Sequence, residues 1–248
     1  MRVLIIAGSD SGGGAGIQAD IKTVTMLGGH ATTAVTAITA QNTLGVQAVQ
    51  AVPAEMVVAQ IESVLGDIGA DAVKIGMIGS ADTAHAVADR LAGVDLPIVF
   101  DPVMIATSGS VLADAATIAA FARLMTLASV VTPNLPELAA LGGRDAVLGF
   151  GCHLAEKGGH AEGAIVVDRL WSPAGLVREV RGERIETTST HGTGCTFATA
   201  LATGLGAGLP VDEAFARAVA FVRQALIAAP GLGQGHGPMG QQFVTDFR

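Results

Sequence analysis

Glycines surround a cysteine near the end of the chain, in the sequence Thr190-His191-Gly192-Thr193-Gly194-Cys195-Thr196. This segment joins a strand-rich region to an apolar stretch with helical spacing. Backbone N–H groups in a glycine turn at a helix start converge on one point and carry partial positive charge. We therefore predict an anion cradle formed by Gly192, Thr193, Gly194 and Cys195, which are the expected catalytic residues.

Cys195 falls in the first turn of that predicted helix. The field at a helix start favours thiolate over thiol, so we expect the pKa of Cys195 to lie below its ordinary value. A cysteine in that state is a candidate base or nucleophile. The alternative is a small buried cysteine packed under a glycine turn.

Asn134 and Glu137 follow a short apolar strand and are three residues apart. At this spacing both lie on one face of a helix, where their oxygens could orient a hydrated Mg²⁺ ion. The alternative is a capping box, with Asn134 as the N-cap and Glu137 as its partner. The sequence leaves both interpretations open.

Further polar residues stand beside apolar stretches. Asp101 comes directly after the predicted strand 97–100, where a structural turn aspartate is the alternative. Gln41 and Asp20 lie near the first glycine-rich loop and could read a polar heterocycle through paired donors and acceptors, or cap the backbone. Lys74 lies in a short apolar strand, and a buried lysine is rare unless it is paired.

The common nucleotide motifs are absent from the first glycine-rich loop, which spans residues 8–16. No window there satisfies GxGxxG, and no Lys-Ser/Thr pair follows for a P-loop. Asp10-Ser11-Gly12-Gly13 resembles the nucleophile loop of trypsin-like proteases, but no histidine precedes it. These observations argue against a dinucleotide-binding oxidoreductase and a serine protease.

Short apolar runs alternate with helical patterns along the chain. The predicted strands are 2–7, 30–40, 46–52, 72–75, 97–100, 129–132 and 164–167, and the predicted helices are 16–27, 53–68, 81–91, 115–125, 135–141, 194–205 and 211–228. This alternation predicts an α/β fold with parallel strands covered on both faces, whose ligands bind beyond the carboxyl ends of the strands. An antiparallel pair is expected at 176–181 and 183–187, turning at Arg181-Gly182.

Composition limits the classes of function. The 248 residues are 50% hydrophobic and 15% charged, with a formal net charge of −8. A chain this apolar is not disordered, and its acidic balance argues against non-specific nucleic-acid binding. It lacks the run of about 20 apolar residues that a membrane-spanning helix needs, and two cysteines are too few for a disulfide framework. With no linker composition in sight, we expect a single cytoplasmic domain over residues 1–248.

Several segments together resemble one family. They are AGSDSGGGAGIQAD, TAQNT, AVKIGMIGS, DPVMIATSGS, VTPNLPE, KGGH, HGTGCT and GHGP. In this order they are similar to the hydroxymethylpyrimidine/phosphomethylpyrimidine kinases of thiamine biosynthesis, members of the ribokinase-like superfamily. The resemblance implies a three-layer α/β/α fold, ATP and Mg²⁺ as cofactors, and commonly a homodimer. It also implies phosphorylation of a pyrimidine alcohol and then of its monophosphate.

The resemblance also implies roles for individual residues. The pyrimidine contacts would be Gln41, Asp20 and Gly8, with Met77 and Val103 as walls of the ring site. The nucleotide contacts would be Asp101, Asn134, Lys157 and Thr188. Glu137 and Asn134 match the superfamily's Mg²⁺/phosphate motif, acting through water. One departure concerns Lys157, because residues 154–156 before it read as helix-like where the family has a hydrophobic strand.

Three other functions remain as alternatives. A pyridoxine or pyridoxal kinase of the same fold would also phosphorylate a hydroxymethyl heteroaromatic compound. A non-catalytic pyrimidine sensor would lack ATP turnover, although the retained Asp101, Asn134, Glu137 and Cys195 argue against it. A dinucleotide-dependent oxidoreductase is disfavoured by the failed glycine pattern.

Overall fold

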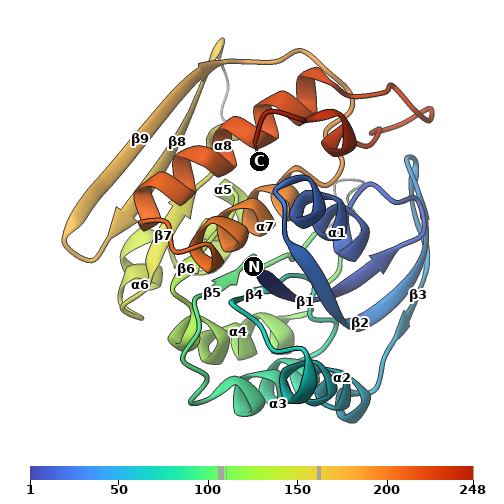
Figure 1. Cartoon of the computed structure of the whole chain (residues 1–248), viewed down its shortest axis with the longest axis vertical. Helices are drawn as coiled ribbons and strands as arrows, with labels where there is room; N and C mark the ends of the chain where they lie inside the picture. The colour runs from blue at the N-terminus through green and yellow to red at the C-terminus, as the bar shows by residue number, and fades with distance from the viewer. Residues whose placement is uncertain (106–108, 110, 161–162, 248) are drawn as a thin grey trace.

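The structure is a computed structural model that describes residues 1–105, 109, 111–160 and 163–247. In this part of the chain, nine strands form one sheet in the order β3-β2-β1-β4-β5-β6-β7-β8-β9 (Figure 1). The strands are β1 (Arg2–Asp10), β2 (His30–Asn42), β3 (Gly45–Ala51), β4 (Ala72–Ile75), β5 (Ile98–Phe100), β6 (Val130–Val131), β7 (His153–Glu156), β8 (Ile165–Ser172) and β9 (Gly175–Glu183). Strands β2, β1, β4, β5, β6 and β7 run parallel, and antiparallel hairpins close both edges.

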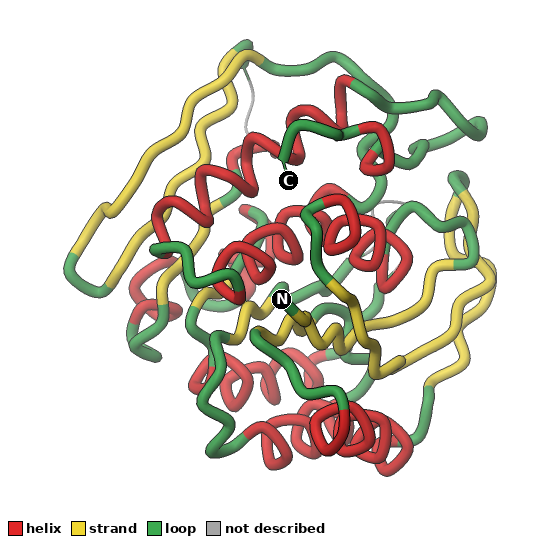
Figure 2. The backbone as a smooth tube through the Cα atoms, in the orientation of Figure 1, coloured by secondary structure: helices red, strands yellow, loops and turns green. Residues whose placement is uncertain are grey.

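Helices cover both faces of the sheet (Figure 2). They are α1 (Gly16–Met26), α2 (Ala54–Asp67), α3 (Ala81–Leu91), α4 (Ala115–Leu127), α5 (Leu135–Ala140), α6 (Arg144–Leu148), α7 (Thr193–Gly206) and α8 (Val211–Ile227). Within β1, Val3 and Ile5 pack against α1, α7 and α8, whereas Leu4 and Ile6 pack on the side of α2, α3 and α4. Two apolar cores separated by one sheet confirm the predicted three-layer α/β/α fold. None of the described helices is both long and apolar enough to cross a membrane.

Two local predictions were wrong. The antiparallel pair consists of β8 and β9 and turns between Ser172 and Gly175, while Gly182 lies inside β9 opposite Val166. Gly182 serves close packing there, because a Cβ atom would lie 2.6 Å from the guanidinium of Arg223. Residues 154–156 belong to β7, where neighbouring side chains enter opposite cores, so the expected helix-like context is a strand.

A buried ion pair ties three elements together beneath the carboxyl edge of the sheet. Lys74 on β4 donates from Nζ to Asp20 Oδ2 on α1 at 2.8 Å, and Thr199 on α7 donates to Asp20 Oδ1 at 2.6 Å. The side chains of Lys74 and Asp20 have no exposed surface. Burial disfavours the ammonium, but the carboxylates of Asp20 and Asp101 keep the pKa of Lys74 above its ordinary value. The pair is therefore charged, as predicted for a buried lysine with a partner.

This pair makes a stability prediction. Lys74→Met leaves the Asp20 carboxylate buried without its counter-ion, so we expect the free energy of unfolding to fall by about 3–5 kcal/mol. The double variant Lys74→Met/Asp20→Leu removes both charges and should recover most of that loss. Urea unfolding of both variants measures this, and a double variant as unstable as the single one would contradict it.

Candidate active site

Several of the polar residues singled out in the sequence lie at or just beyond the ends of the parallel strands. Gly8 and Asp10 close β1, Gln41 closes β2, and Asp101 follows β5. The start of α7 meets the same edge, because α7 contacts β1, β4 and β5. The topology therefore produces a single functional edge, as expected for ligands that bind beyond the carboxyl ends of parallel strands.

Two glycine-containing turns meet at this edge. Gly192 is the N-cap of α7 with φ of +83°, and no described side chain caps the helix start. A Cβ atom on Gly192 would lie 1.9 Å from the carbonyl oxygen of Gly14. A side chain is excluded by both the backbone conformation and the close approach. The N–H groups at the start of α7 thus lie directly beside the loop that follows β1.

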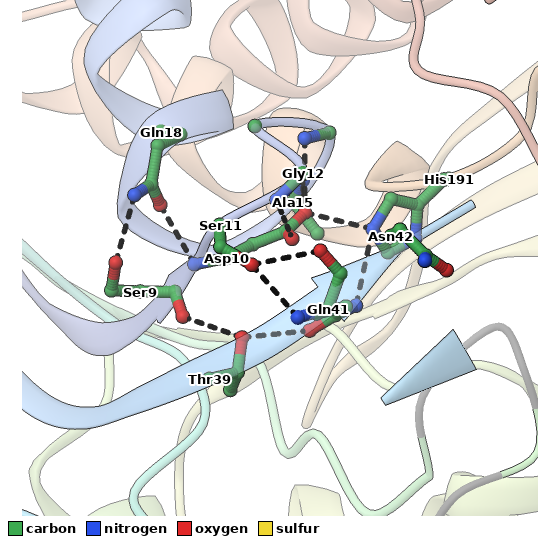
Figure 3. A network of polar contacts seen from close by, with 12 residues as sticks. Ser9, Asp10, Ser11, Gly12, Ala15, Gln18, Thr39, Gln41, Asn42 and His191 are labelled. Atoms are coloured by element: carbon green, nitrogen blue, oxygen red, sulfur yellow. Dashed lines mark hydrogen bonds and ion pairs between the residues drawn. The ribbon is translucent and has the colours of Figure 1, made fainter. Parts of the chain in front are cut away.

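Asp10 holds that loop in shape (Figure 3). Its Oδ1 accepts a hydrogen bond from the N–H of Gly12 at 2.8 Å, and its Oδ2 accepts from the N–H groups of Gly14 and Ala15 at 2.9 and 2.8 Å. His191 Nε2 lies 2.9 Å from the same Oδ2. Burial opposes ionisation, but His191 and these backbone donors outweigh it and hold the pKa of Asp10 below its ordinary value.

Sequence reasoning missed Asp10 and His191 as functional residues. Asp10 was noted only within a false protease motif, and His191 only as part of the glycine-rich turn. An aspartate two residues before a glycine is typical of a side-chain-stabilised turn, which is the signal that was available for Asp10. Nothing in the local sequence indicates that His191 pairs with a residue 181 positions away.

Gln41 faces this cluster from the end of β2 (Figure 3). Its main-chain N–H and carbonyl oxygen both bond to the hydroxyl of Ser11, at 2.7 and 2.8 Å. Its side-chain amide lies between Thr39 Oγ1 at 3.2 Å and His191 Nε2 at 3.3 Å. The structure thus joins the predicted pyrimidine-binding glutamine to both glycine turns.

The predicted walls of the ring site occupy the neighbouring strand ends. The Met77 side chain lies over Gly8, since a Cβ atom on Gly8 would be 2.4 Å from Met77 Cε. The half-buried Val103 follows β5, with its N–H bonded to Asp101 O at 2.8 Å. Residues 106–108 and 110 of the DPVMIATSGS segment lie outside the described residues. Contact of these walls with a pyrimidine stays a prediction.

Asp20 requires a correction. Its side chain is fully buried, and its two oxygens accept from Lys74 and Thr199. A carboxylate enclosed in this way has no surface to offer a ligand in the cleft. Asp20 therefore supports the site from the layer beneath it, because its buried carboxylate is not exposed for the expected direct contact with a pyrimidine.

Asp101 and Lys157 meet at the start of α7. Lys157 Nζ donates to Asp101 Oδ1 at 2.9 Å, and Thr132 Oγ1 donates to the same oxygen at 2.9 Å. A Cβ atom on Gly194 would lie 3.2 Å from Lys157 Nζ. Burial lowers the pKa of Lys157, but the carboxylates of Asp101 and Glu137 raise it by more than burial lowers it. The ammonium therefore stays charged. A lysine from the segment that was hardest to place by sequence thus stands beside the anion cradle.

Asn134 and Glu137 form a capping box at the start of α5, which is one of the two interpretations that the sequence left open. Asn134 Oδ1 accepts from the N–H of Glu137 at 2.9 Å, and Glu137 Oε2 accepts from the N–H of Asn134 at 2.8 Å. Burial raises the pKa of Glu137, and the Lys157 ammonium opposes this shift. Capping engages Asn134 Oδ1 and Glu137 Oε2, and the N–H of Met104 also bonds to the Glu137 carboxylate. The carboxylates of Glu137 and Asp101 are the candidate cation ligands among the described residues here.

This donor set fits a hard cation with few protein ligands. No group of three or more His, Cys, Asp or Glu among the described residues could by itself hold a metal ion. Mg²⁺ characteristically keeps several waters and binds through one or two carboxylates together with substrate phosphates. Glu137 and Asp101 would supply the carboxylates in such an arrangement.

The pKa of the Cys195 thiol was expected below its ordinary value, and this prediction was wrong. Cys195 is half-buried in the first turn of α7, and burial raises its pKa to about 11, while the Lys74 ammonium and the Gly16 N–H act in the opposite direction. The desolvation of the thiolate outweighs the field of the helix start. Cys195 is therefore a neutral thiol at pH 7 in the free protein.

Thr188 lies apart from these contacts. Its residue is exposed, and its carbonyl oxygen accepts from the N–H of Thr190 at 3.0 Å. The structure brings its side chain to none of the described residues of the cradle. Its assignment to the nucleotide site stays a prediction from the family resemblance.

The close approach of the two turns makes a second prediction. Gly192→Ala would push the loop around Gly14 away from the start of α7. We therefore expect the phosphotransferase activity that the family resemblance implies to fall by about 100-fold or more, as for displaced catalytic groups. Gly28→Ala is the matched control, because Gly28 has the same φ of +83° with nothing within 4 Å of its Cβ position. Both variants place alanine at a positive φ, but only Gly192→Ala also brings a Cβ atom against the carbonyl oxygen of Gly14. Equal activity of the two variants in a kinase assay would contradict this role for Gly192.

Comparison with known proteins shows the family of this chain. The family model described as phosphomethylpyrimidine kinase matches residues 10–240. The chain is 47% identical to the hydroxymethylpyrimidine/phosphomethylpyrimidine kinase of Rhizobium meliloti, over 95% of each protein. It is 42% identical to a thiamine biosynthesis multifunctional protein of Corynebacterium efficiens, over 98% of this chain but only 35% of that protein's length.

Solved structures show the same fold. An ADP complex of Bacillus subtilis pyridoxal kinase superposes with a TM-score of 0.88 at 32% identity, over 97% of both chains. Phosphomethylpyrimidine kinase from Clostridium difficile superposes with a TM-score of 0.77 at 34% identity, over 91% of this chain and 99% of that one. The fold is ribokinase-like, and the chain belongs to the phosphomethylpyrimidine kinase family.

Proposed function

We propose that this protein transfers phosphate from ATP to 4-amino-5-hydroxymethyl-2-methylpyrimidine, and then to the resulting monophosphate, in thiamine biosynthesis. The observation that carries the proposal is the meeting of two groups at the start of α7. The loop after β1 contacts it through Gly14 and Gly192, and the Gln41 amide lies 3.3 Å from His191 in the same turn. This contact sets a heterocycle-reading amide beside backbone N–H groups suited to a phosphate. Incubation with ATP, Mg²⁺ and the pyrimidine alcohol should yield the monophosphate and then the diphosphate. A folded protein that forms neither product would exclude the proposal.

The chain's own residues divide the work between two sides. Gln41, Gly8, Met77 and Val103 would hold the pyrimidine ring at the ends of β1, β2, β4 and β5. Lys157 lies beside Gly194, where its charge would stabilise negative oxygens on the transferring phosphate. Glu137 and Asp101 would hold Mg²⁺ through water, and the ion would supply charge neutralisation of the ATP phosphates. Most of the catalysis comes from positioning and charge stabilisation, as in phosphoryl transfer generally.

The two transfers make different demands on a proton acceptor. A primary alcohol must lose its proton as it attacks phosphorus, and we assign that proton to Cys195 Sγ. A phosphomonoester has a second pKa of about 6 and is already mostly dianionic at pH 7. It needs no base. Because the pKa of the Cys195 thiol is about 11, the thiolate fraction increases with pH through the neutral and mildly alkaline range.

This asymmetry predicts the behaviour of Cys195→Ser. We expect the variant to slow phosphorylation of the alcohol by about 100-fold while slowing phosphorylation of the monophosphate only a few-fold, since base catalysis contributes about 10²–10⁴. In the wild type, kcat/KM for the alcohol should rise with pH above neutrality, and the variant should lose that rise. Cys152→Ala is the control, because Cys152 is buried in the opposite core. Equal loss of both transfers in folded Cys195→Ser would remove the base assignment.

A pyridoxal kinase activity is the second candidate. The structural likeness to Bacillus subtilis pyridoxal kinase favours it, and pyridoxal also presents a hydroxymethyl group on a heteroaromatic ring. The ratio of kcat/KM for the pyrimidine alcohol to that for pyridoxal distinguishes the two. The higher identity to pyrimidine kinases supports the pyrimidine as the better substrate.

We also propose a homodimer and a cytoplasmic location. The edge strand β3 and its neighbours expose Ile38, Leu44, Val49 and Met56, each more than half accessible in the isolated chain. Exposed apolar groups beside an edge strand favour association with a second copy. Both cysteines are free, which fits a reducing compartment.

A further inference from the structure

The side-chain amide of Gln41 lies between His191 and Thr39, and each of these residues also contacts a second hydrogen-bond acceptor (Figure 3). On one side, His191 Nε2 is 2.9 Å from Asp10 Oδ2 and 3.3 Å from the amide. On the other side, Thr39 Oγ1 is 2.9 Å from the carbonyl oxygen of Ser9 and 3.2 Å from the amide. Each neighbour therefore contacts one acceptor that cannot donate and one end of the amide.

The count of protons fixes what each neighbour can offer. The Asp10 carboxylate only accepts, so His191 Nε2 carries a hydrogen that is shared between Asp10 and the amide. The Ser9 carbonyl also only accepts, so the single hydroxyl hydrogen of Thr39 goes to Ser9 and leaves a lone pair for the amide. In the structure Gln41 Oε1 lies at Thr39 and Gln41 Nε2 lies at His191. Rotating the amide by half a turn exchanges these two atoms without changing the packing. The one orientation that satisfies both neighbours places the oxygen toward His191 and the NH₂ group toward Thr39.

We propose that His191, held by Asp10, is a positioning residue that fixes the Gln41 amide and so selects the order of donor and acceptor on the substrate ring. With the amide fixed, its second lone pair and its second N–H form a single edge, acceptor on the His191 side and donor on the Thr39 side. This edge matches a ring nitrogen beside an exocyclic amino group, as glutamine pairs with adenine. The inference rests on the proposed function.

The same geometry rejects a ring with the opposite pattern. A 4-oxo pyrimidine presents a carbonyl oxygen beside a ring N–H, so it would need the amide turned around. Turning the amide would set its NH₂ group against the N–H of His191. It would also set its oxygen against Thr39 Oγ1, whose one hydrogen is already donated to Ser9. The ring cannot turn over instead, because its hydroxymethyl group must reach the turn at Gly192. The Gln41 amide is thereby held in one of its two possible orientations by Asp10, His191 and Thr39, and it binds only rings with the matching order of donor and acceptor.

The test compares the binding of two alcohols that differ at one atom. Calorimetry measures Kd for the 4-amino alcohol and its 4-oxo analogue with wild type, His191→Leu and His191→Gln. We expect wild type to favour the amino compound by about 100-fold, within the range for one bidentate amide contact with a base edge. His191→Leu should lower this ratio to about threefold or less, because the amide is free to turn. His191→Gln keeps an N–H donor near the Nε2 position and should restore most of the preference.

Controls separate the possible outcomes. His85→Leu removes an exposed histidine on α3 and should leave the ratio unchanged. Thr39→Val removes the lone pair on the other side of the amide and should lower the ratio as His191→Leu does, which keeps the test decisive if that variant fails to fold. Unchanged preference in folded His191→Leu or Thr39→Val would overturn the inference and leave the proposed function standing. A wild type that binds neither alcohol would overturn both.

Discussion

The site depends on one carboxylate. Asp10 collects the backbone N–H groups of Gly12, Gly14 and Ala15 together with the imidazole of His191. These bonds curl the loop after β1 and tie it to the turn that opens α7. The packing of Gly14 against Gly192 follows from this tie, and with it the distance between the heterocycle side and the phosphate side. Because the carboxylate is nearly fully buried, its charge is stabilised by hydrogen bonds and not by water.

The positive charge available to a bound phosphate comes from groups within the site and not from the net charge of the chain. The chain carries 22 acidic and 14 basic residues, so it cannot attract a nucleotide through its overall field. Backbone N–H groups at the start of α7 and the Lys157 ammonium supply positive charge at the cradle, and the Lys74–Asp20 pair lies beneath it. The half-buried position of Cys195 keeps its thiol neutral until a substrate and a higher pH change the balance.

The architecture and most site positions were predictable because they rest on local patterns. The helix α3 and the strand β4 occupy their predicted residues, and periodic apolar runs placed most other strands and helices to within a few residues. In contrast, α6 and β7 were not predicted, and β8 continues five residues beyond the predicted strand 164–167. The spacing of Asn134 and Glu137 left a capping box and a Mg²⁺ site both open, and the structure shows the capping box. The errors arose where contacts between residues far apart in the sequence determine the role of a side chain. Gly182 looked like a turn but serves packing against Arg223, and Asp20 looked like a ligand-binding group but pairs with Lys74. The pKa of Cys195 depends on burial that no local sequence reveals.

A crystal structure with the pyrimidine alcohol and a non-hydrolysable β,γ-methylene analogue of ATP would show whether the two glycine turns form one site. We expect the terminal phosphate at the N–H groups of residues 193–195, with the substrate hydroxyl between it and Cys195 Sγ. We also expect the ring nitrogen and amino group on the amide of Gln41. A phosphate bound elsewhere, or a pyrimidine that does not touch Gln41, would contradict these expectations.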